Sequence, residues 1–154
     1  MILASTTSTG YKIVLLLHIV FVVAAFGGLF AAPILARVEG ASQSAAAGMV
    51  GYLKRIAIPS AILAGILGIG MISMSKDTVG GVTIETFTFK QSWVSIAMVL
   101  WLAEIAIYFF GLLPAERKVA GGDAEAAKRL PMFTGIIHLL LVVLIYLMVF
   151  KPGA

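Results

Sequence analysis

Hydrophobic residues in this chain are gathered in four blocks separated by shorter polar stretches. The blocks cover about residues 11–36, 56–75, 92–113 and 130–150. A largely uncharged apolar run of about 20 residues is typical of a helix that crosses the hydrocarbon core of a bilayer. The pattern therefore predicts an all-α integral membrane protein, a four-helix bundle that forms a single transmembrane domain over residues 1–154.

Two of the connections between these blocks have patterns of their own. Ser44–Leu53, in an Ala-, Ser- and Gly-rich connection, predicts a short amphipathic helix lying at the membrane surface. Val82–Phe89, with the sequence VTIETFTF, alternates apolar and polar residues and predicts a strand or hairpin arm on that surface.

Proline and glycine predict where several helices end. We expect Pro33 to kink or terminate the first helix, and Pro114 to end the third. In the third connection, Gly121 and Gly122 are followed by Asp123, a pattern typical of a helix end and a new helix N-cap.

Charged residues make up 12% of the chain, about half the usual fraction for a soluble domain. The first and third connections hold seven basic residues: Arg37, Lys54, Arg55, Arg117, Lys118, Lys128 and Arg129. The opposite side holds four: Lys12, Lys76, Lys90 and Lys151. Because basic loops stay in the cytoplasm, this bias predicts an up-down-up-down bundle in a bacterial cytoplasmic (inner) membrane, with both termini on the outer side. The net charge of +4 is therefore interpreted as basic residues at helix ends that set the topology and contact anionic lipid head groups. We expect no nucleic-acid partner.

The residues that usually carry catalysis are missing from the sequence. The chain contains no cysteine, which excludes disulfides, thiol catalysis and thiolate metal sites. It also has no glycine-rich phosphate loop, nucleophile elbow or HExxH pattern. We therefore predict no catalytic residue and no metal site, and the chain is more readily interpreted as a non-enzyme.

Away from the helix ends, the predicted helices contain one acidic residue and two histidines: Glu104, His18 and His138. A helix rise of about 1.5 Å per residue puts Glu104 and His138 at one depth, and His18 roughly 10 Å nearer the outer surface. We expect Glu104 and His138 to form a polar intramembrane pair, because pairing offsets the cost of burying each group. Such a pair is either a proton relay or ligand-binding site, or a structural contact that fixes which helices are neighbours.

The depth of His18 bears on cofactor binding. A haem held by both histidines would need their ring nitrogens on opposite sides of one iron, which the difference in depth argues against. Two hypotheses remain for His18: a single axial ligand to haem b, or a histidine that is hydrated or bonded to a neighbouring helix.

Small residues recur on the first two predicted helices at spacings that let helices approach closely in lipid. This pattern is typical either of a dimer interface or of packing within the bundle. The residues concerned are Gly27, Gly28, Ser60, Ala64, Gly65 and Gly68.

Several stretches resemble known membrane-protein families. LLLHIVFVVAAFGGLF, followed by LAR, is similar to the first helix of HemJ-type protoporphyrinogen oxidases and of copper-resistance-D-like proteins, and IPSAILAGILGIG is similar to their second. GLLPAERKV and LIYLMVFKP resemble a bacterial family of predicted integral membrane proteins of unknown function. The resemblance covers nearly the whole chain and implies a four-helix membrane fold.

The third helix departs from the HemJ-type pattern, in which a Trp-x-His-x-Lys motif is implicated in haem and porphyrin chemistry. Trp93 is present, but Ser95 and Ala97 stand at the His and Lys positions. Only His18 carries over, so the resemblance supports the fold more than the oxidase activity.

Three functions are compatible with these features. The first is a small membrane protein without catalysis, an accessory or scaffold subunit that packs against itself or a larger complex. The second is a haem- or porphyrin-binding redox protein that uses His18. The third is a proton-coupled transporter centred on Glu104.

Overall fold

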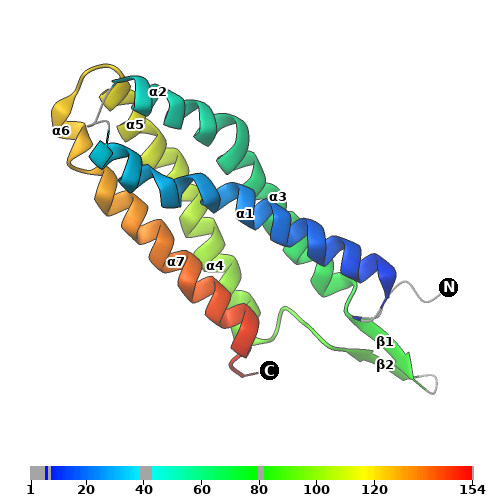
Figure 1. Cartoon of the computed structure of the whole chain (residues 1–154). Helices are drawn as coiled ribbons and strands as arrows, with labels where there is room; N and C mark the ends of the chain where they lie inside the picture. Colours follow the sequence, from blue (N-terminus) through cyan, green and yellow to red (C-terminus); the bar gives the residue numbers. More distant parts are fainter. Residues whose placement is uncertain (1–5, 7, 39–42, 80–81, 154) are drawn as a thin grey trace.

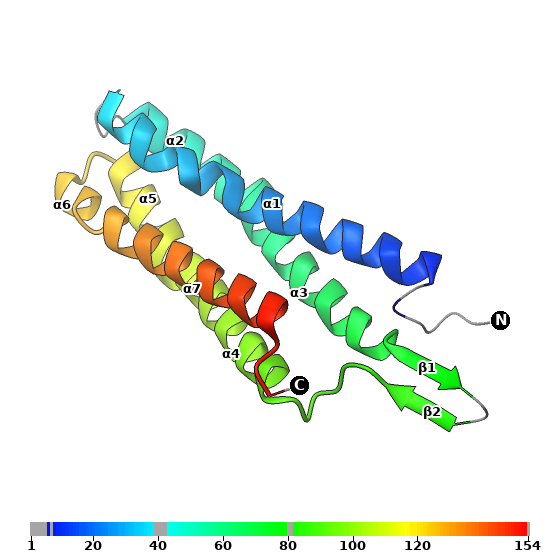
Figure 2. The same cartoon turned by 60° about the horizontal axis from the view of Figure 1, so that its bottom comes forward.

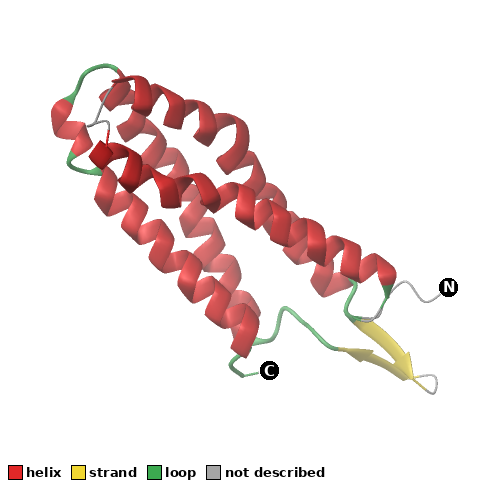
Figure 3. Cartoon of the chain, viewed as in Figure 1, coloured by secondary structure: helices red, strands yellow, loops and turns green. Residues whose placement is uncertain are grey.

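The computed structural model describes residues 6, 8–38, 43–79 and 82–153, and is almost entirely helical (Figures 1 and 3). It has four helices long and apolar enough to cross a membrane. Two of them are built from several consecutive elements without a break. The elements are α1 Thr9–Val38, α2 Gln43–Tyr52, η1 Leu53–Ala57, α3 Ile58–Ser73, β1 Lys76–Val79, β2 Val82–Glu85, α4 Ser92–Ala106, η2 Ile107–Leu112, α5 Leu113–Ala120, α6 Ala124–Ala127 and α7 Leu130–Phe150.

The helices associate in two main pairs, α1 with α3 and α4 with α7, which lie side by side in both views (Figures 1 and 2). The two pairs are joined where α2 packs on α5. The main apolar core lies where α1, η1, η2 and α7 meet, and its fully buried members are Ala25, Leu29, Leu53, Ala57, Tyr108, Leu112 and Ile137. Large apolar side chains elsewhere on α1, α4 and α7 face outward, as expected of helices in contact with lipid.

Two π-helical segments explain why the boundaries of the second and third predicted helices were wrong. Each lies just before a proline, η1 before Pro59 and η2 before Pro114. A proline inside an α-helix lacks an N–H and its ring clashes with the carbonyl four residues earlier. The wider π turn accommodates this mismatch. The helices therefore continue through both prolines, over Gln43–Ser73 and Ser92–Ala120.

The short surface helix predicted at Ser44–Leu53 is consequently the first part of one continuous helix. Pro33 does not terminate α1 either, because the helix continues to Val38. The N-terminal boundary of the fourth predicted helix is confirmed, since α7 begins at Leu130.

The connections at the two ends of the bundle have different structures. β1 and β2 form an antiparallel hairpin in which Lys76 pairs with Glu85. This confirms the predicted strand only as far as Glu85, because Thr86–Phe89 lie outside it. At the other end α5 stops at Ala120, and Asp123 Oδ1 accepts hydrogen bonds from the backbone N–H groups of the following turn, as predicted.

Candidate functional site

Two tyrosines, one buried and one half-buried, form a polar centre in the bundle. Tyr108, in η2, is completely buried, and its hydroxyl donates to the backbone carbonyl of Ala25 on α1 at 3.0 Å. Tyr52, at the end of α2, reaches the same carbonyl oxygen at 3.1 Å. One backbone group of α1 is thus shared by side chains from the second and third long apolar helices.

Tyr52 also enters the hydrogen-bond ladder of α1. Its hydroxyl lies 2.7 Å from the carbonyl oxygen of Ala24 and accepts from the N–H of Gly28 at 3.0 Å. A Cβ at position 28 would overlap the tyrosine ring, so this approach requires glycine. A side chain inserted into the ladder is a recognised cause of helix bending, and α1 changes direction along its length in Figure 1.

Glu104 lies one helical turn before Tyr108 and is turned into the bundle. Only 1% of the residue is exposed, and its Oε1 atom has no hydrogen-bond partner among the described residues. The two residues share one face of the helix because they are four positions apart. The polar centre therefore comprises Tyr52, Glu104 and Tyr108. Tyr52 directly precedes η1 and Tyr108 lies within η2, and π turns are frequent at functional sites.

His138 lies at a similar depth to Glu104. Contacts of Gly111 with Phe133 and of Ser92 with Pro152 set the register between α4 and α7. Both contacts place Glu104 opposite residue 140, which is two residues, or about 3 Å along the axis, from His138.

No hydrogen bond or ion pair joins the two side chains in the described part of the chain. The imidazole of His138 instead stacks on Phe30 with ring centroids 4.3 Å apart. Its Nε2 atom is buried and has no hydrogen-bond partner among the described residues. Among the described residues three buried polar atoms lack a partner, and two of them, Glu104 Oε1 and His138 Nε2, lie at nearly one depth; the third is Trp93 Nε1.

His18 is separate from this centre. Its Nδ1 atom lies 2.8 Å from the carbonyl oxygen of Ala64 on α3. Trp101 donates from Nε1 to the carbonyl of Ala61 at 2.9 Å, which aligns α4 with α3. Counting along both helices, His18 and Glu104 differ by about six residues, or roughly 9 Å along the axis.

The small residues singled out in the sequence face three different surroundings. A Cβ at Gly65 would overlap the indole of Trp101, and one at Gly68 would come within 3.5 Å of His18. Ser60 and Ala64 are buried on the same helix. Gly27 has no other group within 4 Å of a Cβ position and faces out of the bundle.

Sequence reasoning missed Tyr52, Tyr108 and Trp101 as polar contacts. The spacing of Tyr108 four residues after Glu104 was a usable signal. Tyr52 carried no comparable signal, because its segment was interpreted as a surface connection and not as part of a spanning helix.

The described residues contain no group of three or more His, Cys, Asp or Glu side chains that could hold a metal ion. The arrangement can fix helix positions by hydrogen bonding, and it can hold a proton on a buried carboxyl group. Comparison of the chain with protein-family models, curated proteins and solved structures finds no match in any of the three.

Proposed function

We propose that the chain is a multi-pass protein of a bacterial cytoplasmic membrane, with helices that alternate in direction and both termini outside. The four long apolar helices and the seven-to-four distribution of basic residues support this arrangement. Two contacts agree with alternating helices. Gly10, at the start of α1, lies beside Met74, at the end of α3, and Ser92, at the start of α4, bonds Pro152, just beyond α7.

We infer that the protein acts without catalysis, as an accessory or scaffold subunit. The observation that carries this proposal is the closure of the polar centre, in which Glu104 is 1% exposed and both tyrosine hydroxyls bond backbone groups. A site that processes a substrate needs access for it. Buried polar contacts of this kind fix which helices are neighbours.

A scaffold must also contact something outside its own bundle. Most of the small residues considered above pack within the chain, but Gly27 lies open on α1. Small outward-facing residues allow a second helix to approach closely in lipid. This surface supports association with another copy or with a larger complex.

Purification of the protein in a mild detergent tests this function. We expect no cofactor absorbance in the visible range, and a molecular mass by light scattering that corresponds to an oligomer or a complex. A monomer that carries a bound chromophore would overturn the accessory role.

A second function, haem or porphyrin binding through His18, is favoured by one specific contact. Because Nδ1 lies against the carbonyl of Ala64, it is the nitrogen that carries the proton, and Nε2 keeps its lone pair. Iron-ligating histidines are commonly oriented in this way. The resemblance of the first helix to HemJ-type oxidases points to the same residue.

Expression with added haem separates these two functions. If His18 is an axial ligand, a Soret band should appear in the purified protein. The band should be lost in His18→Ala and kept in His138→Ala. Absence of any Soret band in the unmodified protein would reject haem binding.

A proton-coupled transporter is supported less well. Such a protein needs a cavity that reaches Glu104. Neither the cavity beside α5 and α6 nor the cavity beside the hairpin is lined by this residue.

A further inference from the structure

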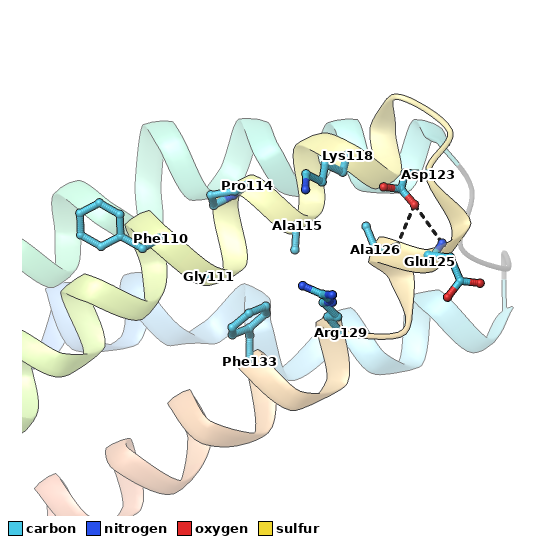
Figure 4. Close-up of a pocket in the computed structure, with 10 residues that line it drawn as sticks. All are labelled: Phe110, Gly111, Pro114, Ala115, Lys118, Asp123, Glu125, Ala126, Arg129 and Phe133. Carbon is cyan, nitrogen blue, oxygen red and sulfur yellow. Dashed lines mark hydrogen bonds between the residues drawn. The ribbon is translucent and has the colours of Figure 1, made fainter.

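A cavity of about 200 Å³ lies where η2, α5, α6 and the start of α7 meet, and none of the three polar-centre residues lines it (Figure 4). A single water molecule needs only about 10–15 Å³ of such volume. The cavity could therefore hold a group considerably larger than one water. It is lined by Phe110, Gly111, Pro114, Ala115, Lys118, Asp123, Glu125, Ala126, Arg129 and Phe133.

The charged end of the cavity has two cationic side chains that are free to bind an anion. Asp123 is committed to two backbone N–H groups of α6, and Glu125 Oε1 lies 2.7 Å from Lys128 Nζ. Neither Lys118 nor Arg129 forms an ion pair with any residue that the structure describes. Figure 4 shows these two side chains on either side of Ala115.

The other end of the cavity is aromatic. Phe133 packs against Gly111, and Phe110 on η2 is 86% exposed on the outer surface of the bundle. In a spanning helix, an exposed phenylalanine at this position contacts lipid chains. The lining therefore changes from apolar to charged over a short distance, with Lys118 and Arg129 beside two carboxylates, Asp123 and Glu125, that already have other partners.

We propose that this cavity binds the phosphate head group of an anionic phospholipid, with Lys118 and Arg129 as partners of the phosphate oxygens. Arginine and lysine are the usual phosphate-binding side chains, and anionic lipids are concentrated on the cytoplasmic leaflet. A free phosphate ion has the same charged oxygens, but it would make no use of Phe110 and Phe133. The inference rests on membrane insertion and is independent of the accessory role.

Native mass spectrometry of the full chain in a non-ionic detergent, with phosphatidylglycerol and phosphatidylcholine as probes, tests the proposal. Each basic side chain near a lipid surface contributes about 1 kcal/mol, or roughly a fivefold change in affinity. We expect Lys118→Gln and Arg129→Gln each to weaken phosphatidylglycerol binding about fivefold, and the double variant to weaken it on the order of 30-fold. Arg117→Gln is the matched control, because Arg117 is exposed on the same helix but does not line the cavity.

The proposal is supported if phosphatidylglycerol binds more tightly than phosphatidylcholine, Arg117→Gln changes its affinity less than twofold, and inorganic phosphate in the millimolar range does not displace it. If Arg117→Gln loses as much phosphatidylglycerol affinity as the two cavity variants, binding reflects general attraction to the basic surface, and the site is overturned. Unchanged phosphatidylglycerol affinity in the Lys118→Gln/Arg129→Gln double variant would also overturn the site. Complete displacement by inorganic phosphate would assign the cavity to the free ion and reject the lipid. Circular dichroism of each variant verifies that the helices are intact.

Discussion

The hydroxyl groups of Tyr52 and Tyr108 converge on a single carbonyl oxygen, that of Ala25, at 3.1 and 3.0 Å. These residues belong to different spanning helices, and Ala25 belongs to α1. The shared acceptor therefore ties three helices together at one depth. Because little water reaches a bilayer interior to replace a lost partner, such contacts constrain helix arrangement strongly.

Removing the two hydroxyls should destabilise the bundle in a coupled way. We expect Tyr108→Phe to lower the free energy of unfolding by about 1 kcal/mol. Tyr52→Phe should lower it by about 1–3 kcal/mol, because its hydroxyl bonds both the N–H of Gly28 and the carbonyl of Ala24. Because both donors serve Ala25, the effects should deviate from additivity by at least ~0.5 kcal/mol in a double-mutant cycle.

Unfolding in mixed detergent micelles measures these values. Tyr146→Phe is the control, since Tyr146 is 51% exposed and its ring contact with Phe150 survives the change. Strict additivity of Tyr52→Phe and Tyr108→Phe would contradict the shared acceptor.

Gly65 is expected to tolerate no side chain, because a Cβ there would overlap the indole of Trp101. Gly65→Ala should lower the free energy of unfolding by about 1–3 kcal/mol, the usual effect of overpacking. Gly70→Ala, on the same helix with nothing within 4 Å of its Cβ position, should be neutral or stabilising by up to ~1 kcal/mol. Equal effects of the two substitutions in the same micelle assay would argue against close packing of Trp101 on α3.

The absence of cysteine makes the membrane orientation directly measurable. We expect Thr83→Cys, in the hairpin, to react with a membrane-impermeant maleimide added to spheroplasts, in which the outer membrane is removed and the cytoplasmic membrane is intact. Ala124→Cys, beside the third connection, should react only in inside-out vesicles. Labelling of both positions from one side would contradict alternating helices, and the reverse pattern would invert the proposed orientation.

The four hydrophobic blocks were sufficient to predict the number of long apolar helices among the described residues, because length and apolar character are properties of the sequence alone. Their ends were harder to predict. Pro59 and Pro114 resemble helix boundaries, but the π turns at η1 and η2 absorb them, and whether a helix does this depends on its tertiary neighbours.

For the site too, some features could be predicted from the sequence and others could not. Glu104 stood out as a lone carboxylate in an apolar helix, and its depth relative to His138 follows from helix rise alone. The partners of each side chain depend on how the helices are rotated about their axes, which spacing does not determine. Thus the stacking of His138 on Phe30, and the two tyrosine contacts on α1, required the structure.

The central claim is that the polar centre around Glu104 is closed. Glu104→Cys creates the chain's single thiol. Its accessibility can be measured with a small membrane-impermeant thiol reagent, added to right-side-out vesicles and to inside-out vesicles. Ala124→Cys is the reactive control. The closed centre predicts no labelling of position 104 from either side, and full labelling after denaturation. Labelling of the folded protein at position 104 would reveal an aqueous path to the carboxylate and contradict the account.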